Sequence, residues 1–335
     1  MSVAPGVPTH LTMSAIRRGI SNGIPTTFQD DKTIQFNCQT YHKWMSNFGQ
    51  IRIQFDMSEG PEVKRTAARL HEALAGETIQ SIDAHHKKIL AALAETPDAL
   101  LGRKILRVHS LGKHILFDLD NGSHLHNHLL MFGSWRIYAR RAKIEPDPRI
   151  MEIVCTQKHR AVLRGGSVFE LLPAGTLEKH PRITKLGPDV LGETFDEKRA
   201  LKNFKKHPDV EIGVALLDQE IVAGIGNYLK SEILFVTRTN PRALIRELSD
   251  TRLREMIRAA RAVTLYSFEN ASFTIPDEIR ARVQETGMSP LTVGRRHYVF
   301  RRTNKPCWNC GTPIRQYRQG AGKGRITYYC PNCQA

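Results

Sequence analysis

The chain has 335 residues, enough for two domains with a substantial core. It carries 49 Lys and Arg against 33 Asp and Glu, a net charge of +16, and residues 295–335 hold nine basic residues and no acidic one. This asymmetry favours a polyanionic partner, nucleic acid before a membrane surface, because no stretch approaches the length of an apolar membrane span; the alternative is a basic protein without such a partner.

Residues 1–56 show no sustained periodicity and form an extension whose fold the sequence does not specify. The pattern sharpens at residues 57–63, MSEGPEV, which look like the beginning of a chain. A helix is expected from Pro61, because proline suits a first helical turn and Gly76 stands where a helix end favours glycine. Its apolar face would consist of Val63, Ala67, Leu70 and Leu74.

Short alternating runs follow and predict a β-rich domain. Asn121-Gly122 is a hairpin signal between two of these runs, and Cys155 is expected to be a buried strand residue. The domain should end near residue 188, where Gly-Pro-Asp marks a connection. The expected strands are 105–111, 113–119, 123–130, 134–139 and 150–155.

Three histidines, His124, His126 and His128, occupy alternate positions and share one strand face. Such a pattern can bind a metal, but a site here needs a fourth ligand and supporting groups that the sequence does not indicate. We therefore expect no metal at these histidines.

Residues 208–222 predict a helix, with Val210, Val214, Leu217 and Ile221 on one face. The glycines in AGIG at 223–226 interrupt it, and a second helix resumes at Asn227. Asn227 is expected to be the N-cap of that helix. Free backbone N–H groups beside it could also bind a phosphate, and the residues themselves leave both roles open.

Four of the six cysteines, Cys307, Cys310, Cys330 and Cys333, form the pattern C-x2-C-x19-C-x2-C. Two tight knuckles with this spacing present four thiolates tetrahedrally to one zinc ion. Two disulfides are the alternative, but no secretory signal is evident and the other cysteines are isolated, which favours a reducing compartment. Since protein fills all four positions, one structural zinc ion is expected.

Four motifs together resemble the formamidopyrimidine-DNA glycosylase/endonuclease VIII family in order and rough spacing. They are MSEGPEV, LGK at 111–113, LDQEIVAGIGNYLKSEIL at 217–234 and the four-cysteine ribbon, so the resemblance covers residues 57–335. It implies an α+β protein with a β-sandwich catalytic domain at 57–188, a helix–two-turn–helix DNA-binding domain at 189–294 and a zinc finger at 295–335. Damaged DNA is then the implied partner of a monomeric base-excision-repair enzyme.

The resemblance gives MSEGPEV a chemical meaning. Enzymes of this family attack C1′ of a damaged nucleotide with their terminal amine, and the Schiff base supports β,δ-elimination. The usual pattern has proline after methionine, and one branch uses valine, whereas this chain has Ser58. An amide nitrogen cannot form an imine, so we expect the functional chain to begin at Ser58; the alternative is a helix entry in a member without lyase activity.

The other site roles are implied by position within the family. Glu59 resembles the acid that protonates the departing base or sugar oxygen, and Glu62 its supporting carboxylate. Lys113 resembles the lysine that assists β-elimination and holds a phosphate. The implied DNA contacts are Asn227 and Arg325 on the backbone, Lys185 where endonuclease VIII has an arginine, and His128, Leu129, Leu130 and Met131 at the gap left by the flipped base.

Oxidised pyrimidines are the expected substrates, because HPRITKLGPDVL and GIGNYL resemble endonuclease VIII and the DPRRFG-type loop of the purine enzymes is absent. We expect a cytoplasmic protein, nucleoid-associated in a bacterium, with no membrane partner. Two other classes stay open: a catalytically silent lesion-binding protein on the same scaffold, and a zinc-ribbon nucleic-acid module of unrelated function.

Overall fold

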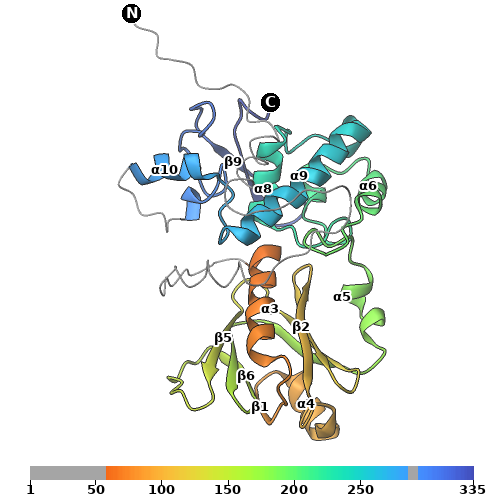
Figure 1. Ribbon diagram of the computed structural model, residues 1–335. Helices are drawn as coiled ribbons and strands as arrows, with labels where there is room; N and C mark the ends of the chain where they lie inside the picture. The colour runs from red at the N-terminus through yellow and green to blue at the C-terminus, as the bar shows by residue number, and fades with distance from the viewer. Residues whose placement is uncertain (1–57, 286–292) are drawn as a thin grey trace, which may run out of the picture.

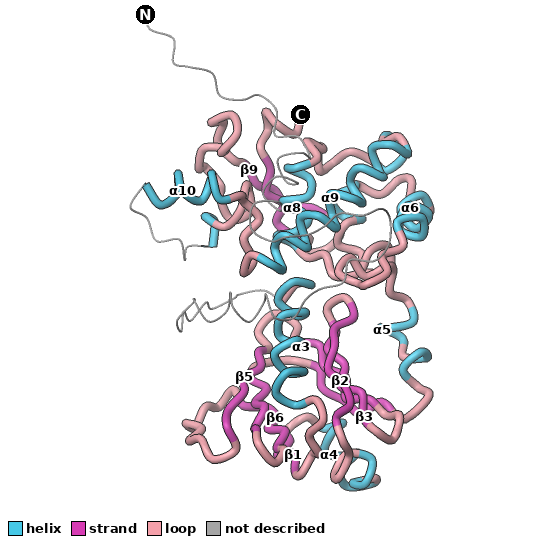
Figure 2. The backbone as a smooth tube through the Cα atoms, viewed as in Figure 1, coloured by secondary structure: helices cyan, strands magenta, loops and turns pink. Residues whose placement is uncertain are grey.

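The computed structural model describes residues 58–285 and 293–335, so the expectation for residues 1–56 lies outside the described part (Figure 1). Most strands gather in one lobe and most helices, with β9, in the other, as Figure 2 shows, and α5 (Pro181–Thr184) lies in the connection between them. No helix in the described ranges is long and apolar enough to cross a membrane.

Helix α3 (Gly60–Leu74) begins where the sequence predicts. Glu59 is its N-cap, and the Glu62 side chain accepts a hydrogen bond from the Glu59 backbone N–H at 3.1 Å, which stabilises the first turn. The predicted apolar face is confirmed, since Val63, Leu70 and Leu74 are fully buried.

Two four-stranded antiparallel sheets form the β lobe, with strand orders β1-β6-β7-β5 and β2-β3-β4-β8. The predicted strands exist, and Cys155 is buried as expected. The sequence pattern does not predict β1, β7 or β8. The strands are β1 Ser81–Ala84, β2 Ile105–Leu111, β3 His114–Leu119, β4 His124–His128, β5 Ser134–Ala139, β6 Ile150–Cys155, β7 His159–Arg164 and β8 Val168–Leu172.

The remaining elements are mostly helical. All of them come after β8 in the chain except α4 and η1, which lie between β1 and β2. They are α4 Lys87–Glu95, η1 Pro97–Ala99, η2 Leu177–Lys179, α6 Glu197–Lys205, α7 Ile212–Ala215, α8 Asn227–Val236, η3 Ile245–Glu247, α9 Asp250–Glu269, α10 Asp277–Glu285 and η4 Val293–Arg295. A two-stranded ribbon, β9 Arg315–Gln319 and β10 Arg325–Tyr329, ends the chain.

The helix expected over residues 208–222 is wrong in length. Only the single turn α7 forms there, and turns occupy most of the remainder. Of the predicted apolar face only Ile221 is fully buried, and Val210, Val214 and Leu217 are half-buried. Ile212 and Leu216, which are not on that face, are buried instead. The segment bends to bring Gly224 and Gly226 against α3, a tertiary contact that helical periodicity does not reveal.

Two separate hydrophobic clusters form the core. One lies within the β lobe and α3, from Val63 to Phe169. The other joins the helical lobe and the ribbon, from Val190 to Cys330. The buried Glu232 of α8 strengthens this second unit, because its carboxylate accepts hydrogen bonds from the backbone N–H groups of Tyr298, Val299 and Phe300, at 2.6–3.0 Å.

Candidate functional site

Glu59 lies where the two lobes meet and is 3% exposed. Its carboxylate accepts hydrogen bonds from the backbone N–H groups of Gly226, Tyr228 and Leu229, at 3.0, 2.8 and 3.2 Å, at the N-terminus of α8. Burial nevertheless raises the pKa of Glu59 to about 7, against the opposing charge of Lys113 and with a further increase from Glu62. A carboxyl with such a pKa can hold and release a proton near neutral pH.

Glycines let α3 and the turn before α8 approach so closely. A Cβ on Gly226 would lie 2.2 Å from the Glu59 Cδ. The Gly60 N–H donates to the Gly224 carbonyl oxygen at 2.9 Å, and a Cβ on Gly60 would also lie 2.9 Å from that oxygen. The glycines of AGIG therefore allow the turn before α8 to pack against the start of α3, in addition to interrupting the helix.

Glu62 anchors a second set of contacts behind Glu59. Its carboxylate accepts hydrogen bonds from the Tyr228 hydroxyl at 3.1 Å, from Arg65 at 2.9 Å and from Ser272. The Tyr228 hydroxyl also lies 3.0 Å from the Ser267 hydroxyl. Glu62 thus joins α3 to α8 and to the turn after α9, and it supports the position of Glu59 through the shared first turn.

Lys113 comes to the same place on the turn between β2 and β3. The Gly112 N–H donates to Asp189 at 2.9 Å, and a Cβ on Gly112, whose φ is +56°, would lie 3.0 Å from the Ala223 Cβ. Burial lowers the pKa of Lys113; the carboxylate of Glu59 opposes this and the charge of Arg325 adds to it. Glu59, Lys113 and Arg325, predicted from three distant motifs, are thus brought within electrostatic range of one another.

Ser58 and Asn227 flank this group. Ser58 directly precedes the Glu59 N-cap. The prediction that Asn227 caps α8 is wrong, because Gly226 is the N-cap and Asn227 is the first helical residue. The Asn227 amide donates to the Ile326 carbonyl of the ribbon at 2.9 Å, and its Oδ1 is buried without a hydrogen-bond partner.

The segment after β4 presents apolar side chains to solvent. The expectation for Leu129 is wrong, because Leu129 is 3% exposed and continues the inward face of the strand. Leu130 and Met131 are 46% and 49% exposed, and Phe132, which the sequence reading missed, is 74% exposed. His128 accepts a hydrogen bond from the Leu130 N–H at 3.1 Å, which helps to fix this segment.

Lys185 lies apart from the acidic group, at the C-terminal end of α5. Its side chain is 68% exposed and its Nζ is 4.0 Å from a Glu220 carboxylate oxygen. An exposed pair of this kind contributes little to stability, so the amine can exchange this partner for another anion.

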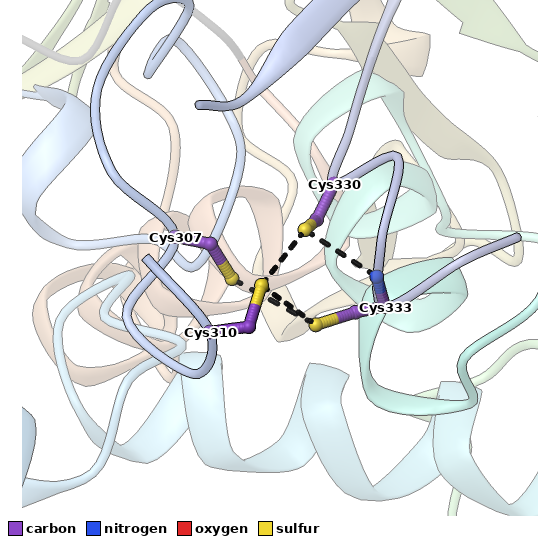
Figure 3. Close-up of side chains that lie close together, drawn as sticks. All are labelled: Cys307, Cys310, Cys330 and Cys333. Carbon is purple, nitrogen blue, oxygen red and sulfur yellow. Dashed lines mark hydrogen bonds between the residues drawn. The ribbon is translucent and has the colours of Figure 1, made fainter. Parts of the chain in front are cut away.

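The four ribbon cysteines converge, as Figure 3 shows. The Sγ atom of Cys310 lies 3.5 Å from the Sγ atoms of both Cys330 and Cys333, and the Sγ atoms of Cys307 and Cys333 are 3.9 Å apart. A tetrahedron with Zn–S bonds of about 2.3 Å has edges of about 3.8 Å. The cysteines are free thiols rather than disulfides, and the site could hold a metal ion.

Several residues at the site escaped the sequence reading because their partners are distant in the chain. Asp189 and Tyr228 are examples: Asp189 accepts a hydrogen bond from the Gly112 N–H, and the Tyr228 hydroxyl donates to Glu62. Lys230 is another: it is fully buried and donates to the Thr327 hydroxyl at 2.7 Å, joining α8 to β10. A lysine inside an apolar helical run, NYLKSEIL, was the available signal.

Comparison with known proteins agrees with this arrangement. Residues 57–166 match the formamidopyrimidine-DNA glycosylase N-terminal domain and residues 186–276 match its H2TH domain. A "probable endonuclease 8 2" of Streptomyces coelicolor is 36% identical over 83% of this chain and 94% of its own length. A "DNA-(apurinic or apyrimidinic site) lyase Nei2" of Mycolicibacterium smegmatis is 34% identical over 83% of this chain and 99% of its own.

The fold is shared with solved structures. A Lactococcus lactis formamidopyrimidine-DNA glycosylase, bound non-covalently to DNA with an AP site, aligns with a TM-score of 0.67 at 23% identity, over 82% of this chain and 99% of that one. The two matched domains and the curated relatives settle the family. The chain belongs to the formamidopyrimidine-DNA glycosylase/endonuclease VIII family of DNA-repair enzymes.

Proposed function

We propose that this protein removes oxidised bases from DNA, pyrimidines foremost, and then cuts the strand by β,δ-elimination through a Schiff base on the Ser58 α-amine. The observation that carries the proposal is the buried Glu59, with its raised pKa, between Ser58 and the N-terminus of α8 and within electrostatic range of Lys113. The proton donor Glu59, the amine of Ser58 and the cation Lys113 then lie close together.

A free amine at Ser58 suits the nucleophilic step. The reference pKa of an α-amine is about 7.7–8.0, so roughly a third of it is neutral at pH 7.5, against about 0.1% of a lysine side chain. The family match begins at residue 57, which supports a reactive form in which Ser58 carries the free amine.

Glu59 would act as the general acid. Its pKa of about 7 leaves a sizeable protonated fraction at neutral pH, and this proton can pass to the departing base or to the sugar oxygen. Glu62 would hold Glu59 in place through the helix turn they share, rather than transfer a proton itself.

The cations and the exposed apolar segment would bind the damaged strand. Lys113 and Arg325 share one electrostatic environment beside Glu59, which suits a phosphate next to the lesion. The Asn227 NH2 donates to the Ile326 carbonyl and its buried Oδ1 has no partner, so a shift of this contact on DNA binding would free the NH2 for a phosphate oxygen. His128, Met131 and Phe132 would fill the gap left by the flipped nucleotide, and Lys185 would contact the backbone.

The ribbon fits a structural zinc ion held by Cys307, Cys310, Cys330 and Cys333. Bound zinc would fix the turns around β9 and β10. The ribbon would thereby hold Arg325, the first residue of β10, near Lys113. The Asn309 amide and the Cys333 N–H lie 3.3 and 3.4 Å from cysteine sulfurs, where donors stabilise thiolate charge.

Borohydride trapping on a duplex with an oxidised pyrimidine tests the proposal. Protein that begins at Ser58 should form a covalent adduct mapping to Ser58, and the 335-residue chain should form none there. DNA binding without any adduct in either form would leave a silent lesion-binding protein instead. An oxidised-purine duplex, run in parallel, tests the substrate preference: equal or faster trapping on the purine would contradict it.

A further inference from the structure

Outside the acidic site and the ribbon, the described residues contain one more group of metal-ligating side chains. His126 and Glu170 face each other on neighbouring strands β4 and β8, and His180 reaches them from the start of α5. The ligating atoms of these three residues all lie within 4.8 Å of one another.

Both imidazoles converge on one oxygen. The Nδ1 of His126 and the Nε2 of His180 lie 2.9 and 3.2 Å from the Oε1 of Glu170. Bonds of about 2.0–2.1 Å to a tetrahedral zinc ion give ligand–ligand separations of about 3.3 Å, so the three atoms need to move little to bind one cation.

His126 has an outer partner for its second ring nitrogen. The Nε2 of His126 lies 2.7 Å from the Nδ1 of His114. With a cation on its Nδ1, His126 keeps the proton on Nε2 and donates it to His114, as outer partners of metal-bound histidines commonly require. The Glu170 carboxylate is held in place by hydrogen bonds with Lys88 and His126.

Lys88 is the obvious competitor for the carboxylate, but it contacts the other oxygen, Oε2, and its own side chain is 69% exposed. It can therefore remain there as an outer partner or turn into solvent. Arg182 adds positive charge nearby. These positive charges disfavour an ion such as Mg²⁺ or Ca²⁺, which is held mainly by charge. They disfavour less an ion that bonds well to imidazole nitrogen.

We propose that His126, Glu170 and His180 bind a second divalent transition-metal ion, of the zinc class, separate from the ribbon. Three protein ligands leave the fourth position to water, and His180 is 14% exposed on its side chain, so solvent can reach it. The ion ties α5 to the β4–β8 edge of the sheet. It thereby fixes the connection between the lobes, which carries Lys185.

This proposal departs from the expectation, drawn from the sequence, that the alternating histidines of β4 bind no metal. Only His126 of the alternating three takes part, because His124 pairs with Asp118 at 2.8 Å and His128 stacks edge-on against His114. The partners come from β8, which the sequence did not predict, and from α5.

Metal content of the full 335-residue chain tests this proposal. After incubation with micromolar zinc and desalting, elemental analysis should find about two ions per chain in the wild type and about one in His180→Ala. His124→Ala, altered on the same strand but outside the group, should keep about two. One ion per chain in the wild type, or equal content in wild type and His180→Ala, would overturn the proposal.

Cobalt gives a second readout that does not depend on a variant folding. Wild-type protein with zinc in the ribbon should bind one equivalent of Co²⁺ and show visible d–d absorption without the intense thiolate charge-transfer band of a cysteine site. No such absorption, or a thiolate band alone, would show that the histidine group holds no metal.

Discussion

At the residue scale, Glu59 shows two opposing effects on one carboxyl. Three backbone N–H groups at a helix N-terminus favour its charged form, yet burial outweighs them and raises its pKa to about 7. The protonated form is therefore favoured by folding, so the contribution of Glu59 to stability falls as pH rises from its ordinary value of 4.5 towards 7.

Glu59→Gln should lower the single-turnover rate of base removal by about 10²–10⁴-fold, because glutamine cannot donate the carboxyl proton. In the wild type, the rate should fall at alkaline pH as Glu59 ionises, and the residual rate of the variant should lack this alkaline decline. Single-turnover assays on a lesion duplex, quenched at fixed times between pH 6 and about 9, measure both the rate loss and the alkaline decline. The exposed Glu72→Gln on the same helix is the control; similar losses in both variants would exclude Glu59 as the acid.

At the element scale, the site depends on how closely the turn before α8 approaches α3. Gly226→Ala places a methyl group where the Glu59 carboxyl lies, so Glu59 must move. A displacement of about 1 Å can cost about 10²-fold in rate, and we expect a loss of that order with the helical circular dichroism retained. Gly166→Ala, where an added Cβ has nothing within 4 Å, should keep wild-type activity. Full activity in Gly226→Ala would contradict the close approach.

The ribbon is the second element with a separable role. Cys330→Ser should release the ribbon metal and weaken DNA binding, because β10 carries Arg325 towards Lys113. Cys155→Ala, a buried cysteine outside the ribbon, is the control. Elemental analysis and a fluorescence binding assay suffice. Unchanged affinity in a variant that has lost this metal would remove the ribbon from DNA binding.

The sequence allowed prediction of elements whose local pattern agrees with their final environment. Helix α3 has both a capping signal and an apolar face, and the predicted strands, β2 to β6, alternate or flank a hairpin signal. The stretch around α7 failed because its apolar spacing is helical while its backbone bends to meet α3. Lys113 and Arg325, identified through motifs, lie near Glu59, whereas Lys185 lies apart; the contacts of Asp189 and Tyr228 join distant segments, which spacing cannot reveal.

At the scale of the whole molecule, two hydrophobic clusters belong to different lobes, and polar contacts from α3 join them. Arg65 makes several of these contacts. It donates to the carbonyl oxygens of Ser267 and Phe268, at 2.9 and 2.8 Å, in the last turn of α9. A guanidinium at a helix C-terminus satisfies carbonyls that have no partner within the helix and interacts favourably with the helix dipole.

Arg65→Ala should therefore loosen the junction without emptying either core. Hydrogen bonds to charged groups contribute about 1.5–3 kcal/mol each, and we expect the free energy of unfolding to fall by roughly 2–4 kcal/mol. Calorimetry should then resolve two transitions, since each lobe keeps its own core, and activity should fall because Glu59 receives its partners from the other lobe. Arg69→Ala, exposed on the same helix, should change the free energy of unfolding by about 0.5 kcal/mol or less. A single unshifted transition in Arg65→Ala would mean that Arg65 is not needed to hold the lobes together.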